Sequence, residues 1–238
     1  KTLLQIHYHS RLGGVWRVID LYAQAFRSKT QNELNTMVWC SSQGAHDFQH
    51  VQKMVFNDLL DYRQYSNDIE VQEMSDYLLS QLITLIDSCA KPVAVVFHNH
   101  SLGKNVAYSA LVGFFAQRYA WVHHDICLYA CLHDFAEEGR FTLLEQFDLC
   151  TTNALPLINI TWDPQIRYIS PSLSGYQKIK KAGAVVRYVP NPVDGEIIDK
   201  DSFKQKTIEK NISQYAAKHN LSFNPDHQSF FYPVRIIS

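Results

Sequence analysis

Leu3-Leu-Gln-Ile-His-Tyr8 is a short apolar segment near the start of the chain, and Ser10-Arg-Leu-Gly-Gly14 follows it as a glycine-containing turn. A buried strand that runs through a tight turn into a helix is a basic unit of α/β folds. The next apolar residues recur at three- and four-residue steps, which predicts a helix with one buried face. These residues are Val15, Val18, Ile19, Tyr22, Ala25 and Phe26.

The same alternation continues along the chain. Further strands are predicted at Leu34–Cys40, Val93–His98, Ile126–His133, Arg167–Ser170, Val185–Val189 and Ser229–Ile237. Helices are predicted at Glu70–Cys89, Lys104–Tyr119, Glu137–Phe147, Pro171–Ala182 and Ser202–His219, and the proline is expected in the first turn of its helix. Ser41–His50 is polar and is predicted to be a loop. Alternating strands and helices with short links predict an α/β fold, a Rossmann-like parallel sheet with helices on both faces.

The composition favours a globular protein without a long-range electrostatic partner. The 238 residues are 46% hydrophobic and 19% charged, which is enough apolar material for a large core. A net charge of −1 argues against nucleic acid or an anionic membrane as a partner. The cysteines are odd in number and lack a Cys-x-x-Cys pair, which favours the reducing cytoplasm over a disulfide-bonded fold. They are Cys40, Cys89, Cys127, Cys131 and Cys150.

Gly13 and Gly14 follow the first predicted strand. In open α/β sheets, ligands bind beyond the carboxyl ends of the strands. A helix N-terminus offers free amide groups and partial positive charge to an anion, and glycines let a phosphate or a sugar approach the backbone closely. The alternative is a tight strand-to-helix turn without a ligand. A Gly-x-Gly-x-x-Gly dinucleotide fingerprint is absent.

Two later strands end in histidine, at His98-Asn-His100 and at His133-Asp134. Carboxyl ends of parallel strands share one edge, so we expect these side chains at the edge of the glycine turn. Histidine there can bond a sugar hydroxyl or titrate near neutral pH, and a His-Asp step can contact a substrate or take part in catalysis. The alternatives are histidines that bond loop carbonyls and a structural His-Asp turn.

The many histidines also raise the question of a metal ion. Possible ligands are His98, His100, His123, His124, Asp125, His133 and Asp134. None shows a recognised spacing such as His-Glu-x-x-His, and adjacent histidines in a strand face opposite sides. We therefore predict no metal and no other cofactor.

Taken together, the segments resemble the amino-terminal domain of GT-B glycosyltransferases of family 4, the group 1 glycosyl transferases. The matching segments occur in the family's order along nearly the whole chain. They are His9-Ser-Arg-Leu-Gly-Gly-Val15, Val96-Phe-His-Asn-His100, Cys131-Leu-His-Asp-Phe135, Tyr168-Ile-Ser-Pro-Ser172, Val189-Pro-Asn-Pro-Val-Asp194 and Phe231-Tyr-Pro-Val-Arg235.

The resemblance implies a domain organisation. Residues 1–200 would be the acceptor-side Rossmann-like domain, and the polar stretch 201–228 would be a linker with a helix. Residues 229–238 would be the first strand of a C-terminal donor-binding domain that is missing here. The chain alone would then be inactive, or nearly so, because the donor sits between the two domains.

The resemblance also implies roles for single residues. Gly13 and Gly14 would lie against the diphosphate or sugar of a nucleotide-sugar donor, and Arg235 would pair with the donor phosphates. His133 would contact the donor sugar near the reacting carbon and is the predicted catalytic residue.

The resemblance also implies that His98, His100 and Asp134 lie on the acceptor side of the site. Such enzymes transfer a sugar, here of hexosyltransferase type, to an acceptor hydroxyl, with retention of configuration and without a metal. The alternatives are a sugar-nucleotide epimerase of the same fold and a stand-alone α/β binding module or metal-dependent hydrolase. Peripheral contact with the inner membrane face is common in such families, but Lys178, Lys180 and Lys181 form only a small basic cluster.

Overall fold

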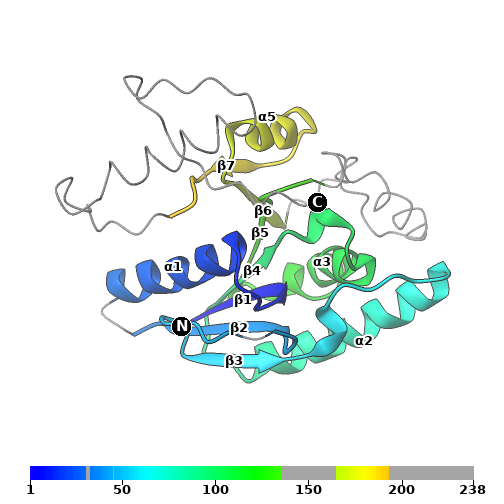
Figure 1. Ribbon diagram of the computed structural model, residues 1–238, viewed down its shortest axis with the longest axis horizontal. Helices are drawn as coiled ribbons and strands as arrows, with labels where there is room; N and C mark the ends of the chain where they lie inside the picture. Colours follow the sequence, from blue (N-terminus) through cyan, green and yellow to red (C-terminus); the bar gives the residue numbers. More distant parts are fainter. Residues whose placement is uncertain (31–32, 45, 136–164, 193–238) are drawn as a thin grey trace, which may run out of the picture. The chain divides into compact units, whose positions relative to one another are not determined.

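The computed structural model describes residues 1–30, 33–44, 46–135 and 165–192 (Figure 1). The chain divides into two units, 1–193 and 194–238, and all described residues belong to the first. Several predictions lie outside the described residues. They are the helices Glu137–Phe147 and Ser202–His219, the strand Ser229–Ile237, Arg235 and the domain boundaries at residues 200 and 228.

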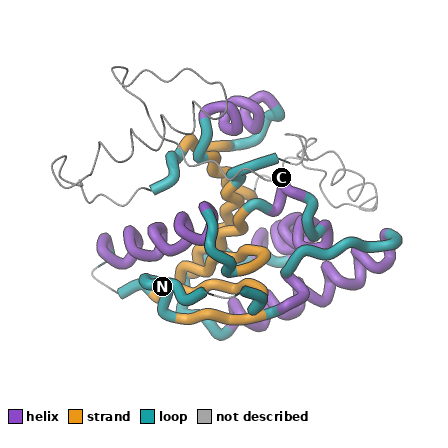
Figure 2. The backbone as a smooth tube through the Cα atoms, viewed as in Figure 1, coloured by secondary structure: helices purple, strands orange, loops and turns teal. Residues whose placement is uncertain are grey.

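A seven-stranded sheet runs through the described part of the chain, in the order β3-β2-β1-β4-β5-β6-β7. Each pair of neighbouring strands is parallel, which confirms the predicted Rossmann-like α/β fold. Figure 2 shows the helices beside the central strands. The strands are β1 (Thr2–His9), β2 (Asn35–Ser41), β3 (Lys53–Phe56), β4 (Val93–His98), β5 (Ile126–Cys131), β6 (Ile166–Ser170) and β7 (Val186–Tyr188).

Helices cover both faces of this sheet, as predicted. The α-helices are α1 (Gly14–Lys29), α2 (Asp68–Asp87), α3 (Val106–Arg118) and α5 (Leu173–Lys181). Short 3-10 helices are η1 (Asp58–Leu60), η2 (His100–Leu102) and η3 (Ala120–Val122). Figure 1 shows α1 on one side of the sheet and α2 with α3 on the other.

Two local predictions need correction. The strand β3 was not predicted, because it is a four-residue edge strand with no fully buried side chain. The helix predicted to contain Pro171 in its first turn begins later, at Leu173. Ser172 is its N-cap, and the Ser172 hydroxyl accepts a hydrogen bond of 3.0 Å from the Gly175 N–H.

Side chains of β1 alternate between two different environments. Leu4, Ile6 and Tyr8 belong to a large apolar cluster that includes α2 and α3. Gln5 faces the other way, toward α1, where its side-chain amide donates to the Ile19 carbonyl at 2.9 Å. The face of the sheet beneath α1 therefore contains buried polar groups, whereas the opposite face is a continuous apolar core.

Candidate functional site

Three adjacent strands bring polar residues to one edge of the sheet. β1 ends at His9, β4 ends at His98, and β5 ends at Cys131, two residues before His133. In the strand register, His98 lies opposite Cys131. Because β1, β4 and β5 are parallel neighbours, the glycine turn after β1 lies at the same edge. This carboxyl edge is where open α/β sheets bind ligands.

A hydrogen-bond chain beneath α1 fixes the tautomer of His98. The Gln5 side-chain nitrogen donates to the Ile19 carbonyl, so the Gln5 Oε1 atom faces His98 Nε2 at 3.1 Å. An amide oxygen only accepts, and His98 Nε2 must therefore carry the hydrogen. It follows that His98 Nδ1 carries a lone pair.

His133 continues this chain toward the edge of the sheet. Its Nε2 atom lies 3.3 Å from His98 Nδ1 and 3.4 Å from the Cys131 sulfur. Since His98 Nδ1 can only accept, His133 Nε2–H donates to it, and His133 Nδ1 is left as an acceptor. His133 is partly exposed, whereas His98 is fully buried. The hydrogen bonds from Gln5 through His98 thus hold the His133 ring in one tautomer and orientation.

Burial keeps these groups uncharged. It lowers the pKa of His133 to about 4 and the pKa of His98 well below its usual value, with nearby histidines adding smaller effects in the same direction. Burial raises the pKa of the Cys131 thiol to about 12, and the nearby Tyr22 side chain of α1 opposes this only in part. Near neutral pH the cluster therefore contains two neutral imidazoles and a protonated thiol.

Among the described residues, His98, Cys131 and His133 form a group that could hold a metal ion. Their ligand atoms, one from each of His98, Cys131 and His133, lie within 4.8 Å of one another. The sequence prediction considered the two histidines but omitted Cys131. The sequence signal for Cys131 was the Cys-x-His step at the end of a predicted strand. Its position opposite His98 follows only from the fold.

Asn99 is a residue of the site that the sequence prediction missed. It adopts a left-handed backbone with φ of 55° immediately after β4. Its Oδ1 atom accepts the backbone N–H groups of His133 at 2.8 Å and Asp134 at 3.3 Å, and its side-chain nitrogen lies 3.4 Å from the Asp134 carboxylate. Asn99 thereby fixes the His133–Asp134 step relative to β4.

His100 does not join this cluster. It is buried in η2, and burial lowers its pKa to about 3. Its backbone carbonyl accepts a hydrogen bond of 2.6 Å from Ser109 of α3, whereas its Nδ1 atom has no hydrogen-bond partner among the described residues. Its burial in η2 keeps His100 away from the His98–His133 pair, and no described contact tests its predicted role on the acceptor side.

At the glycine turn, packing leaves open space. Gly13 is the N-cap of α1 with φ of 173° and ψ of 179°, an extended backbone that any residue can adopt. A Cβ atom on Gly14 would meet no described atom within 4 Å. The helix start has no side-chain cap and no acidic residue in its first turn. Its amide groups are therefore open to an anion.

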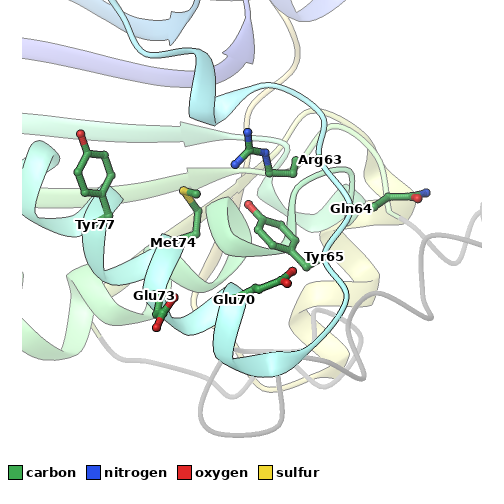
Figure 3. Close-up of a pocket in the computed structure, with 7 residues that line it drawn as sticks. All are labelled: Arg63, Gln64, Tyr65, Glu70, Glu73, Met74 and Tyr77. Atoms are coloured by element: carbon green, nitrogen blue, oxygen red, sulfur yellow. The ribbon is translucent and has the colours of Figure 1, made fainter.

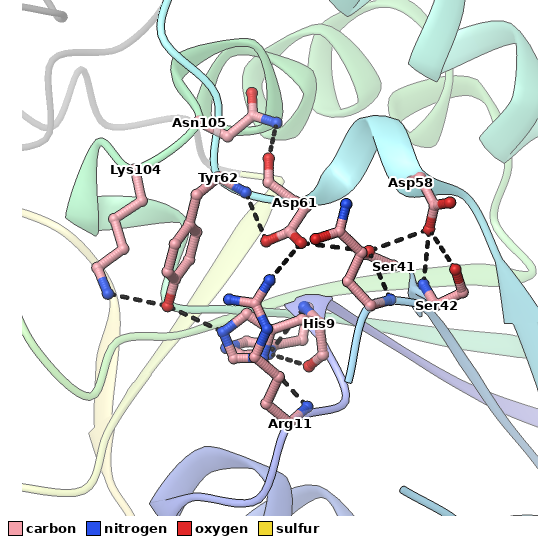
Figure 4. A network of polar contacts seen from close by, with 11 residues as sticks. His9, Arg11, Ser41, Ser42, Asp58, Asp61, Tyr62, Lys104 and Asn105 are labelled. Carbon is pink, nitrogen blue, oxygen red and sulfur yellow. Dashed lines mark hydrogen bonds and ion pairs between the residues drawn. The ribbon is translucent and has the colours of Figure 1, made fainter. Parts of the chain in front are cut away.

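A second polar network lies beside this edge, around Tyr62 (Figure 4). Lys104 Nζ lies 2.8 Å and His9 Nε2 lies 2.9 Å from the Tyr62 hydroxyl. His9 Nδ1 accepts the Arg11 N–H at 3.3 Å, so His9 Nε2 carries its hydrogen and donates to Tyr62. With both donors on its oxygen, the Tyr62 hydroxyl is set to donate its own hydrogen to a further group.

The Tyr62 network is anchored by an ion pair. The Arg11 guanidinium contacts the Asp61 carboxylate at 2.6 Å, and Asp61 is mostly buried. None of these residues was predicted as functional. Arg11, Asp61, Tyr62 and Lys104 lie in loops of different parts of the sequence, and only the fold brings them together.

A separate surface pocket lies at the start of α2 (Figure 3). None of the predicted site residues lines it. Its lining consists of Arg63, Gln64, Tyr65, Glu70, Glu73, Met74 and Tyr77.

Comparison with known proteins adds no further information about the site. No protein-family model and no curated protein matches the chain. The resemblance described above thus rests on the sequence motifs themselves. Within the described part of the chain, every helix is too short or too polar to cross a membrane.

Proposed function

We propose that the chain is the amino-terminal, acceptor-side domain of a cytoplasmic glycosyltransferase of the GT-B type, which transfers a sugar from a nucleotide-sugar to an acceptor hydroxyl. The observation that carries this proposal is the convergence at one sheet edge. There, the open glycine turn after β1 meets the ends of β4 and β5, where His98 and His133 lie. The motif resemblance supplies the class of substrate.

In this proposal, the start of α1 receives the donor diphosphate. The uncapped amide groups and the positive end of the helix dipole attract an anion. The open space in front of Gly14 lets the phosphate reach the backbone. Arg235 would add a bidentate contact from beyond the described residues.

His133 would accept a hydrogen bond from a hydroxyl of the donor sugar. The tautomer deduced above leaves His133 Nδ1 as an acceptor, and the low pKa keeps the ring neutral at pH 7. His98 and Gln5 are positioning residues in this scheme, because they lie behind His133 and fix its ring. A fixed acceptor orients the donor before reaction, which is a main source of catalytic acceleration.

The acceptor side would include the Tyr62 network. Tyr62 and Lys104 offer hydrogen-bond donors at the same sheet edge, and a sugar or other polyhydroxyl acceptor can accept from both. Asp134 lies partly exposed next to His133 and would contact the acceptor from the other side. The reaction itself, including retention of configuration, also requires the donor-binding domain of the proposed architecture.

Release of nucleoside diphosphate from a panel of nucleotide-sugars tests the proposal in the intact two-domain protein. His133→Ala should lower the rate by at least about tenfold, which corresponds to about 1.4 kcal/mol of lost transition-state stabilisation. The matched control is His124→Ala, an exposed histidine that precedes β5 and so lies at the opposite edge. An unchanged release rate in His133→Ala, or an equal loss of rate in both variants, would contradict the proposal.

The alternative functions correspond to other outcomes of the same assay. A donor converted into its epimer without transfer indicates a sugar-nucleotide epimerase. An absence of turnover with every donor favours a binding module or a hydrolase.

A further inference from the structure

The His98–Cys131–His133 cluster has features that sugar binding alone does not require. His98, Cys131 and His133 each offer one ligand atom, and these atoms lie within 4.8 Å of one another at the ends of two adjacent strands. His133 Nε2 contacts both His98 Nδ1 and the Cys131 sulfur. A neutral imidazole nitrogen and a cysteine sulfur are the ligand types that zinc prefers.

The spacing of these atoms fits a tetrahedral zinc ion. Bonds of about 2.0–2.1 Å to nitrogen and about 2.3 Å to sulfur separate two nitrogens by about 3.3 Å, and a nitrogen from a sulfur by about 3.6 Å. In the structure, the two nitrogens are 3.3 Å apart, the Cys131 sulfur is 3.4 Å from His133 Nε2, and the remaining pair, from His98 and Cys131, lies within 4.8 Å. Small side-chain movements would therefore suffice to close the site around an ion.

The surroundings of His98 resemble the outer shell of a metal site. Metal-ligating histidines almost always donate their other ring N–H to an oxygen, which orients the ring. His98 Nε2 faces the Gln5 Oε1 atom at 3.1 Å, and the Gln5 amide is itself fixed by the Ile19 carbonyl at 2.9 Å. The His98 lone pair is thus held toward Cys131 and His133 before any ion arrives.

We propose that His98, Cys131 and His133 bind a zinc ion, with a water molecule as fourth ligand on the partly exposed side of His133. On binding, the zinc replaces the proton of the Cys131 thiol, which is released to solvent. His133 then coordinates through Nε2, so its hydrogen must reside on Nδ1. The ion therefore converts His133 Nδ1 from a hydrogen-bond acceptor into a donor.

Cobalt titration of the metal-free protein tests the site directly. A cobalt ion bound by a thiolate adds a sulfur-to-metal charge-transfer band in the near ultraviolet, and tetrahedral ligation adds intense visible bands. We expect both with one equivalent of Co²⁺, and their loss when zinc is added. Gln5→Leu should weaken cobalt binding about 10–100-fold, the usual cost of removing an outer-shell partner.

The cysteine variants decide the assignment. Cys131→Ser should remove the charge-transfer band, while Cys40→Ser, which alters an equally buried thiol of β2, should keep it. A band that persists in Cys131→Ser, or no band at one equivalent in the parent protein, would overturn the proposal. If Cys131→Ser fails to fold, His133→Gln replaces it, and unchanged cobalt affinity in that variant would overturn the site.

The consequence for sugar transfer rests on the proposed function. A zinc-bound His133 cannot accept the donor's hydroxyl, so zinc should inhibit nucleoside diphosphate release in the parent protein and should not inhibit Cys131→Ser. The spectroscopic result does not depend on turnover. A protein that binds cobalt through Cys131 but transfers no sugar retains the metal site and loses the proposed function.

Discussion

The two faces of the sheet differ in what they bury. Toward α2 and α3, β1 and β4 place Leu4, Ile6, Val95 and Phe97 in a continuous apolar core. Toward α1, the same strands place buried polar groups of Gln5, His7 and His98 next to a small apolar cluster.

Burying polar groups costs free energy unless each finds a partner. The α1 face meets this cost with the chain of hydrogen bonds from Ile19 through Gln5 and His98 to His133. The apolar face contributes mainly through buried apolar area, and the hydroxyls of its buried Tyr8 and Tyr108 donate to backbone carbonyls. One face of the sheet thus contributes mainly stability, and the other holds the polar groups of the candidate site.

The largest expected effect is a cavity in the apolar face. Phe97→Ala removes a fully buried ring, and we expect a loss of about 3–5 kcal/mol in the free energy of unfolding. Phe26→Ala is the matched control, because this phenylalanine of α1 is 45% exposed and should cost under about 1 kcal/mol. Denaturant titration measures both. Similar losses in the two variants would contradict the assignment of stability to the apolar face.

A smaller effect is expected at the link between β4 and His133. Asn99→Gly keeps the left-handed backbone without strain but removes the acceptor of two backbone N–H groups, for an expected loss of about 1–3 kcal/mol. Asn99→Asp retains the accepting oxygen but places a second carboxylate oxygen beside Asp134, so it should restore only part of the stability. Equal stability of Asn99→Gly and the parent protein in thermal unfolding would remove Asn99 from its proposed role.

Acid should destabilise the protein through its buried histidines. Burial lowers the pKa of His7 and His100 to about 3 and that of His133 to about 4, so these rings stay neutral in the folded state. The unfolded chain takes up protons below pH 6.5, so stability is lost as the pH falls from about 6.5 toward about 3, by up to about 1.4 kcal/mol per pH unit for each histidine.

His100→Gln isolates one of these contributions. The free energy of unfolding, measured by urea titration between pH 6.5 and 5.5, should fall less in this variant than in the parent protein, by about 1 kcal/mol over that interval. An identical slope in the variant and the parent protein would contradict the lowered pKa of His100.

The smallest effect on stability is expected at Tyr62. Its ring is 43% exposed, so Tyr62→Phe should change the free energy of unfolding by less than about 0.5 kcal/mol. In the proposed function, the same variant should raise the KM for the acceptor, because it removes a donor held by His9 and Lys104. An unchanged acceptor KM would exclude the Tyr62 network from acceptor binding.

The sequence predicted the apolar framework well, and for a physical reason. Strands such as Val93–His98 and helices such as α2 follow from hydrophobic periodicity, which is a local property of the chain. It also placed the glycine turn and the strand-end histidines at one edge, since parallel strands share their carboxyl ends. The edge strand β3 was missed because it buries too little apolar surface to leave a pattern.

The details of the site were beyond sequence reasoning because they depend on register and tautomer. Nothing local indicates that Cys131 lies opposite His98, or that Gln5 orients an imidazole on another strand. The left-handed backbone of Asn99 and the Arg11–Asp61 ion pair likewise join residues from separate loops. Such contacts follow from the completed fold.

The hydrogen bonds beneath α1 fix the His133 ring so that its Nδ1 atom can accept a hydrogen bond. Long-range ¹⁵N–¹H correlation spectroscopy of the metal-free protein at neutral pH reads the tautomer of each histidine directly. We predict a hydrogen on Nε2 of both His98 and His133, and a shift of His133 toward mixed tautomers in Gln5→Leu. A hydrogen on Nδ1 of His133 in the parent protein would contradict the account.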